Sequence, residues 1–338
     1  MVYNNRRQHN SFLLFYRDTY MRFFTKKRKL GWFAIRASEK GSYVAHVLSS
    51  SSKVPPLKKP TVTVGISRSG SLKDNATIKA LTADLNLNNQ HCSLLLGHGE
   101  YQLLQIEKPN VPANELKQAV RWKLKDMIDY PVEQATIDVI DIPSDPNNAN
   151  RQPYVYAVVA KNTLISDYIE RWIDFSGAGL DAIDIPELAQ RNIAAFLEKE
   201  GRGLAMLTIN SAGGLLTFTS GGELYHARNI EIDTKQIFSD DSERKSSVFE
   251  RLSLEIQRSL DNFERQFPYI TISRLVLAPF MGREDFYDYL KTSLYIQIER
   301  LDLTDVFNFE NNVELGDLAM QASLLPALGA ALREEKSA

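Results

Sequence analysis

Residues 204–230 read LAMLTINSAGGLLTFTSGGELYHARNI and carry the strongest local indication of the fold. Three short apolar runs are recognisable there: Leu204–Asn210, Leu215–Thr219 and Leu224–Ile230. Gly213-Gly214 and Gly221-Gly222 lie between successive runs. Because glycine pairs between short apolar runs favour tight turns, this pattern predicts a three-stranded β-meander.

A second meander is expected near the N-terminal end, with strands at Leu30–Ala37, Tyr43–Leu48 and Thr61–Ile66. Helical and strand patterns follow each meander, and a helix expected at Glu187–Glu200 connects the two halves. The sequence therefore predicts an α/β protein whose two lobes repeat one architecture.

Several further elements are expected between and after the meanders. His91–Leu96 and Tyr101–Ile106 flank Gly97-His98-Gly99-Glu100, which predicts a hairpin. The other expected elements are a helix at Ala113–Ile128, strands at Ala135–Ile142 and Tyr154–Ala160, and helices at Leu72–Leu85, Ser246–Gln266 and Leu318–Arg333.

The near-neutral charge of the 338-residue chain, −2, conceals a strong asymmetry. Residues 1–60 contain 13 Lys and Arg but only Asp18 and Glu39, a net charge of +11, which leaves −13 for the remainder. The single cysteine, Cys92, excludes an intramolecular disulfide and is typical of a reducing compartment. No apolar run approaches the ~20 residues of a membrane span, so we expect a cytoplasmic protein.

Residues 1–29 form a basic, partly aromatic extension. Aromatic side chains recur every four residues at Phe12, Tyr16, Tyr20 and Phe24, and Lys26, Lys27, Arg28 and Lys29 follow them. This pattern is compatible with a helix on an anionic membrane surface, and equally with a solvated tail. A third reading is that translation starts at Met21. Nucleic-acid binding is not expected, because no zinc, helix-turn-helix or RNA-binding motif accompanies the basic run.

Four segments of the chain resemble the PilM family of type IV pilus assembly proteins, and most closely its MshI branch from mannose-sensitive haemagglutinin (MSHA) pilus biogenesis. The segments are Arg121–Lys125 with Asp129–Val132 and Ala135–Asp138, Ala178–Asp184, Leu254–Asp261, and Pro326–Arg333. They lie between residues 121 and 333, in the family's order and spacing.

The resemblance implies a two-lobed actin-like (ribonuclease H-like) fold with an additional small α/β subdomain in the first lobe. The implied boundaries are 30–187 for the first lobe, about 91–155 for its inserted subdomain and 188–317 for the second lobe. Residues 318–338 would form a C-terminal helix that returns to the first lobe.

Three elements that hold nucleotide and metal in actin-like ATPases are degraded here. Such proteins carry an acidic residue and a following glycine on the first hairpin of each lobe, where backbone N–H groups approach phosphates. The first hairpin instead has Ala34 and Arg36, and the second has Thr208 and Asn210. Ala278 and Pro279 stand where an adenine-side glycine pair is expected. The sequence therefore predicts a pseudo-ATPase without ATP or Mg²⁺ as a cofactor.

The expected helix at Ala113–Ile128 has an apolar face and the aromatic residue Trp122. Core packing is the simpler interpretation of this pattern. The functional alternative is one wall of a groove that binds a short apolar segment, formed by Leu116, Ala119, Trp122, Lys123 and Met127. In the PilM family, the resemblance implies, such a groove takes the cytoplasmic N-terminal tail of a PilN-like inner-membrane protein.

The sequence thus predicts a non-catalytic scaffold that binds a PilN-like protein, with the cytoplasmic motor ATPase of the pilus as a further partner. The chain would associate peripherally with the inner membrane. An ATP-binding protein whose nucleotide regulates partner affinity, and an actin-like protein that polymerises on a membrane, are the alternatives. No metal site is expected, since only Glu100 accompanies His91, Cys92 and His98.

Overall fold

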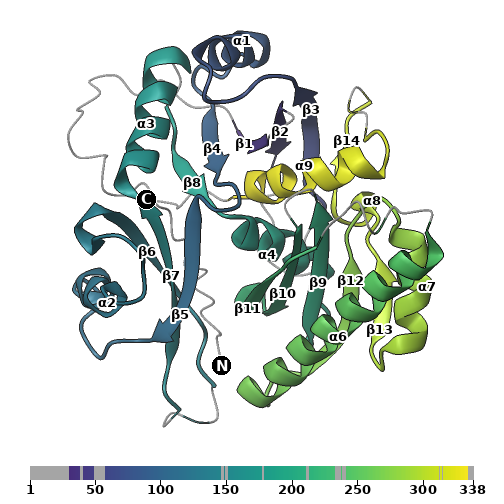
Figure 1. Cartoon of the computed structure of the whole chain (residues 1–338). Coiled ribbons are helices and arrows are strands. Elements are labelled where there is room, and N and C mark those ends of the chain that lie inside the picture. Colours follow the sequence, from purple (N-terminus) through teal and green to yellow (C-terminus); the bar gives the residue numbers. More distant parts are fainter. Residues whose placement is uncertain are drawn as a thin grey trace.

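The computed structural model describes residues 30–333, apart from 39–40, 49–57, 146–147, 149–150, 177–178, 211–212, 233–236, 238–240, 312 and 314. The basic residues Lys26, Lys27, Arg28 and Lys29 and the last five residues of the expected C-terminal helix lie outside this range. The described chain contains two large sheets and one small sheet (Figure 1).

The first large sheet has the strand order β14-β3-β2-β1-β4-β8. Its strands are β1 (Trp32–Ser38), β2 (Gly41–Leu48), β3 (Thr61–Arg68), β4 (His91–Leu95), β8 (Ala182–Asp184) and β14 (Asn308–Phe309). The meander β1 to β3 is antiparallel, whereas β4 pairs in parallel with both β1 and β8.

The second large sheet has the order β11-β10-β9-β12-β13. Its strands are β9 (Gly203–Asn210), β10 (Gly213–Ser220), β11 (Glu223–Ile230), β12 (Ile272–Leu277) and β13 (Gln297–Arg300). This sheet repeats the order β3-β2-β1-β4-β8, again with an antiparallel meander followed by two parallel pairings. The expected repeat of one α/β architecture is therefore confirmed.

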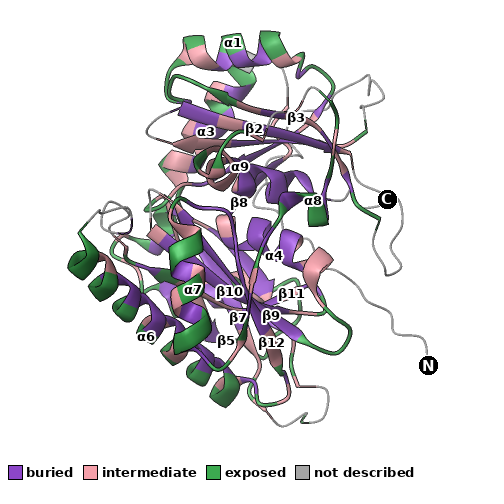
Figure 2. Cartoon of the chain, turned by 90° about the vertical axis from the view of Figure 1, so that its right-hand side faces the viewer, coloured by how far each residue is buried: buried purple, intermediate pink, exposed green. Residues whose placement is uncertain are grey.

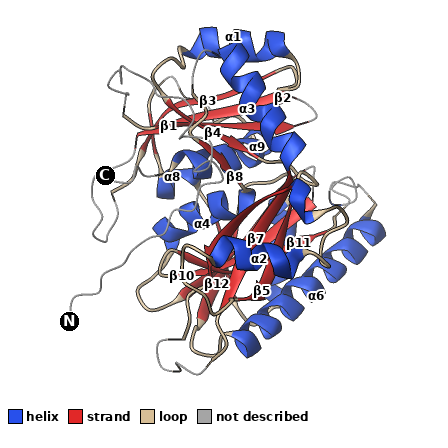
Figure 3. Cartoon of the chain, turned by 90° about the vertical axis from the view of Figure 1, so that its left-hand side faces the viewer, coloured by secondary structure: helices blue, strands red, loops and turns tan. Residues whose placement is uncertain are grey.

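A three-stranded antiparallel sheet, β5-β7-β6, forms a separate small unit. It consists of β5 (Tyr101–Glu107), β6 (Ala135–Asp141) and β7 (Tyr154–Lys161), with the short 3-10 helix η1 (Val132–Gln134) before β6. The helix α2 (Leu116–Leu124) packs on one face through Val120 and Leu124 (Figure 3).

The expected hairpin between His91–Leu96 and Tyr101–Ile106 is wrong, because β4 and β5 belong to different sheets. The residues Cys92 to Leu95 are all buried, as is typical of an interior parallel strand, and β4 pairs with β1 from His91 opposite Trp32. The glycine-containing turn therefore leads the chain from the first large sheet into the small unit. The strands of that unit span residues 101–161, compared with the expected range of about 91–155.

The remaining helices cover the large sheets. They are α1 (Asn75–Leu85), α3 (Asn162–Ser176), α4 (Pro186–Leu197), α6 (Ser242–Gln266), α7 (Arg283–Ser293), α8 (Leu303–Val306) and α9 (Leu318–Ala331). Two of them start at aspartate N-caps that differ from the expected starts. Asp74 caps α1 by accepting from the Ala76 N–H, and Asp241 caps α6 by accepting from the N–H groups of Glu243 and Arg244.

The helices α4 and α9 lie between the two large sheets (Figure 2). They share one apolar core with both lobes, which includes Ala34 and Val47 from the first and Met206 and Val276 from the second. The helices cross at Gly329, where an added Cβ atom would lie 2.2 Å from the Ala189 carbonyl oxygen. Glycine at this position allows the close crossing that joins the two lobes.

Candidate functional site

Three of the six residues that were predicted to occupy degraded nucleotide positions come together at a cavity between the lobes. Arg36 of β1 and Thr208 and Asn210 of β9 line this cavity, whose volume is about 510 Å³. Ala34 is fully buried in the apolar core between the lobes. Ala278 and Pro279 follow β12 and are buried, and neither lines the cavity. The Ala278 N–H donates to the Leu207 carbonyl at 2.9 Å, as a continuation of the sheet.

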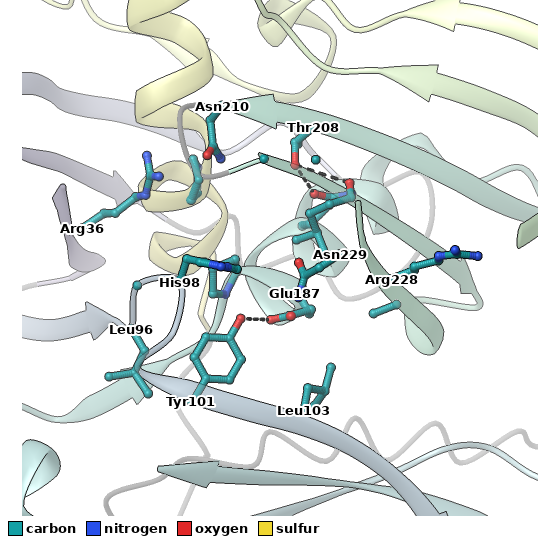
Figure 4. Close-up of a pocket in the computed structure, with 18 of the residues that line it drawn as sticks. Arg36, Leu96, His98, Tyr101, Leu103, Glu187, Thr208, Asn210, Arg228 and Asn229 are labelled. Carbon is teal, nitrogen blue, oxygen red and sulfur yellow. Dashed lines mark hydrogen bonds between the residues drawn. The ribbon is translucent and has the colours of Figure 1, made fainter. Parts of the chain in front are cut away.

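The cavity is built by segments that are distant in the sequence (Figure 4). The first lobe contributes β1 and the turn between β4 and β5, and the second contributes the β9–β10 hairpin and β11. The other lining residues are Leu96, Gly97, His98, Gly99, Tyr101, Gln102, Leu103, Pro186, Glu187, Gln190, Ile193, Gly213, Gly214, Leu215, Ala227, Arg228, Asn229, Leu325 and Pro326. A volume of this size is typical of small-molecule sites.

On the second-lobe side, Thr208 belongs to a buried hydrogen-bond network centred on the Gln190 amide. The Thr208 hydroxyl donates to Gln190 Oε1 at 2.9 Å. Gln190 Nε2 lies 2.7 Å from the Met206 carbonyl oxygen and 2.9 Å from Thr217 Oγ1. These groups are neutral and satisfy one another, so this network offers little attraction to a metal ion or a phosphate. Arg228 of β11 also lines the second-lobe side, where its charge is paired with Glu255.

On the first-lobe side, Arg36 brings a positive charge to the cavity. Its Nη1 atom donates to the Ser323 carbonyl of α9 at 3.2 Å. Burial lowers the pKa of the Arg36 guanidinium from its ordinary value. An arginine nevertheless stays protonated in proteins, so the cavity contains a partly desolvated cation.

The cavity also contains a carboxyl group that sequence reasoning missed. Glu187, at the start of α4, is buried and accepts a hydrogen bond of 2.6 Å from the Tyr101 hydroxyl (Figure 4). Burial raises the pKa of Glu187, although the Tyr101 hydrogen bond opposes this shift. Burial, followed by the Glu187 charge, raises the pKa of Tyr101 well above its ordinary value. An acid beside Pro186 in an otherwise apolar segment was the available signal, since such a residue is rarely buried without a partner.

The small unit presents a different surface at α2. Trp122 is 69% exposed and Met127 is 45% exposed. The preference for core packing at Trp122 is therefore wrong. The physical reason is helical geometry, because Val120 and Leu124 face the sheet and lie two positions from Trp122, about 200° around the helix.

The five residues of the predicted groove differ in exposure, and Met127 lies beyond the end of α2. Leu116 packs partly against the small unit's core, and Ala119 is half-buried. Lys123 is exposed, and its Nζ atom donates to the Glu107 carbonyl at 3.2 Å. Trp122 and Met127 are the exposed apolar members of the set. The groove itself stays a prediction.

The His91 and Cys92 side chains pack against other protein groups. The Cys92 thiol is buried and forms no disulfide. The His91 ring stacks on Trp32 with 4.9 Å between ring centroids, and His91 Nδ1 lies 3.7 Å from Asp181 Oδ2. Across the described residues, no cluster of three or more His, Cys, Asp or Glu side chains is arranged to hold a metal ion. No helix in the described ranges combines the length and apolar character needed to cross a membrane.

No protein-family model and no curated protein sequence matches the chain. Solved structures do match. A structure of the PilM–PilN type IV pilus biogenesis complex is 17% identical, with a TM-score of 0.68, over 90% of this chain and 98% of that chain.

Two further structures are less similar. A Bacteroides thetaiotaomicron protein with an actin-like ATPase fold and unknown function is 11% identical, with a TM-score of 0.49, over 90% of this chain and 98% of that chain. The cytoplasmic domain of EpsL from Vibrio cholerae is 13% identical, with a TM-score of 0.43, over 88% of this chain and 94% of that chain. At such identities the likeness concerns the fold, and the chain has the two-lobed actin-like ATPase fold.

Proposed function

We propose that this chain is a non-catalytic, cytoplasmic adaptor of type IV pilus assembly that binds the N-terminal tail of a PilN-like inner-membrane protein. The similarity to a PilM–PilN complex supports this proposal, because the match extends over 90% of the chain and includes both lobes. The sequence segments that resemble the MshI branch favour an MSHA-type pilus. The adaptor would associate with the inner membrane through its partner and act beside the pilus motor ATPase.

The observation that carries the proposal is the exposed Trp122 on α2. A large aromatic side chain that is 69% exposed leaves considerable apolar surface in water. Covering such a side chain contributes about 2 kcal/mol to an association, and tryptophan is enriched among residues that dominate binding energies. Met127 adds an exposed, flexible apolar side chain nearby in the sequence. Together they suit a short peptide with a few apolar anchors.

The chemistry of the cavity supports the non-catalytic part of the proposal. Among the described residues that line it, Glu187 is the sole acidic side chain, and it is already bonded to Tyr101. Ala34 and Thr208 supply no carboxylate where a Mg²⁺ ion and its water would need one. We therefore expect no ATP turnover above a buffer blank.

Titration with synthetic N-terminal peptides of candidate membrane partners tests the proposal. Trp32 and Trp172 are 8% and 2% exposed, so a change in tryptophan emission on binding would report chiefly on Trp122. We expect a blue shift on binding in the wild type. Isothermal titration, which needs no tryptophan reporter, should show a loss of affinity of at least about tenfold in Trp122→Ala.

Tyr295→Ala is the matched control, because Tyr295 is a fully exposed aromatic residue in the second lobe. This variant should bind with wild-type affinity. Equal affinity in Trp122→Ala and the wild type would remove α2 from the binding site.

A further inference from the structure

The charge of Arg36 is not balanced by the protein around it. In the part of the chain that the structure describes, no carboxylate forms an ion pair with this guanidinium, and its one hydrogen bond goes to the Ser323 carbonyl. Among the described residues, the ionisable Tyr43 raises the pKa of Arg36 and so opposes the effect of burial, which is larger. Arg36 lines the cavity, and the remaining N–H donors of its guanidinium have no anionic partner among the described residues.

Burial of this guanidinium is compensated only in part, and water in the cavity must satisfy the donors that no described protein group reaches. Removing a cation from water costs free energy unless a counter-charge or hydrogen bonds compensate. One carbonyl satisfies one of the five N–H donors of an arginine. The position is therefore suited to a ligand that supplies a negative charge.

The remainder of the cavity indicates what kind of ligand would fit. Its wall combines apolar side chains such as Leu103 and Leu215 with neutral amides such as Asn210 and Asn229. The charge of Arg228, the other arginine among the described lining residues, is paired with Glu255. Glu187 is the sole acidic group among the described lining residues, and the Tyr101 hydroxyl bonds to it (Figure 4). A small molecule with an anionic group at Arg36 and a neutral, partly apolar body matches this distribution.

We propose that the cavity between the lobes binds a small molecule bearing a phosphate or carboxylate group, held by the Arg36 guanidinium without a divalent metal ion. A guanidinium presents paired N–H donors in a planar fork that matches two oxygens of either group. The ligand would contact Arg36 from the first lobe and side chains such as Asn210 from the second. Occupancy would therefore stabilise one arrangement of the two lobes.

Thermal unfolding and isothermal titration of the full chain test this inference, with EDTA present to exclude metals. The probes are inorganic phosphate, AMP and citrate, with adenosine as the uncharged analogue of AMP. We expect at least one anion to raise Tm by about 2 to 5 °C at saturating concentration. AMP or phosphate would identify a phosphate site, and citrate alone would identify a carboxylate site. Adenosine should have no effect.

Arg36→Gln should weaken the binding of that anion by about tenfold or more, because a hydrogen bond to a charged group is lost. Arg68→Gln is the matched control, since Arg68 lies on β3 with an exposed ion pair to Asp84 at 3.6 Å. In the absence of anions, Arg36→Gln should unfold at the wild-type Tm or above it. A purely structural role in holding α9 predicts a lower Tm instead.

Three results would overturn the inference. They are the absence of binding by every anion, equal binding by Arg36→Gln and the wild type, and binding of Mg-ATP that is tighter than that of every metal-free probe. None of them depends on the peptide titration at Trp122, so the two proposals can fail separately.

Discussion

The strands β1 and β9 occupy the same place in the two large sheets, yet they present different chemistry to the space between the lobes. In β1, Ala34 is buried in apolar packing and Arg36 brings a desolvated charge to the cavity. In β9, Thr208 belongs to a neutral hydrogen-bond network with Gln190. The repeated topology places equivalent positions of the two lobes at one cavity. The groups around Thr208 satisfy one another, whereas the Arg36 guanidinium has donors left for a ligand.

The two lobes are joined by the helices α4 and α9, which pack into a core common to both lobes. The helix α9 packs against the first sheet and against α4, and its core includes residues of both lobes. A change at the α4–α9 crossing should therefore affect both lobes. A change at one wall of the cavity should affect mainly the lobe that forms that wall.

The largest effect is expected for Gly329→Ala at the crossing. The new Cβ atom would lie 2.2 Å from the Ala189 carbonyl oxygen, which is backbone and cannot move aside like a flexible side chain. We expect a loss of about 4 kcal/mol in the free energy of unfolding, measured by urea denaturation.

Gly97→Ala is the control for this variant. The nearest atom to its added Cβ is a carboxylate oxygen of Glu100 at 3.3 Å, which belongs to a flexible side chain. The loss there should stay below about 1 kcal/mol. Similar losses in the two variants would mean that the close approach of α9 to α4 at Gly329 is not required for stability.

The second effect concerns the neutral wall formed by β9 and α4. Gln190→Leu preserves the approximate size of the side chain but leaves the Thr208 hydroxyl and buried carbonyl groups of the second lobe without their partner. Buried groups without hydrogen bonds cost about 1 to 3 kcal/mol, so urea denaturation should show a loss of about 3 kcal/mol.

Gln257→Leu is the matched change on α6, where Gln257 is half-buried and, among the described residues, donates to the Asp261 carboxylate. It should alter stability by less than about 0.5 kcal/mol. If Gln190→Leu changed the free energy of unfolding by as little as Gln257→Leu, the hydrogen bonds of Gln190 would not stabilise the second-lobe wall. The proposed difference between Thr208 and Arg36 would then lose its support.

Much of the fold was predictable because its signals are local. Glycine pairs such as Gly213-Gly214 mark turns, and alternating apolar runs mark the meanders on either side of them. The repetition of that pattern predicted two lobes. The partner of β4 was not predictable in the same way, because a short turn at Gly97 to Glu100 suits both a hairpin and a change of sheet. Pairing between β1 and β4 is a long-range property.

The candidate site was predictable in part. The resemblance to actin-like ATPases led to the prediction that Ala34, Arg36 and Thr208 depart from a nucleotide-binding pattern, and this stays a prediction. The sequence did not show that Gln190 would bond to Thr208, because α4 reaches β9 only in the folded chain. The exposure of Trp122 was also missed, since the α2 sequence contains two interleaved apolar sets, of which only one faces the sheet.

The smallest expected effect on stability comes from a difference between His46 and His226, which lie in the two meanders. His46 in the first lobe stacks on Phe33 and hydrogen-bonds to Thr63 through Nδ1. Within the described part of the second lobe, the Nδ1 atom of His226 is buried without a hydrogen-bond partner. Burial, assisted by the charge of Arg228, lowers the pKa of His226 to about 4.

This shift makes the stability of the second lobe sensitive to mild acid. Because the pKa of His226 is lower in the folded state than its ordinary value of 6.5, the unfolded chain binds more protons between pH 6.5 and pH 4. Stability should therefore fall as the pH decreases through this window. Between pH 7.5 and pH 5 the wild type should lose about 2 kcal/mol more than His226→Phe in urea denaturation. The raised pKa of Glu187 acts in the opposite direction, but it is common to both proteins and cancels in the difference. Parallel pH profiles for the two proteins would show that His226 is hydrated in the folded state.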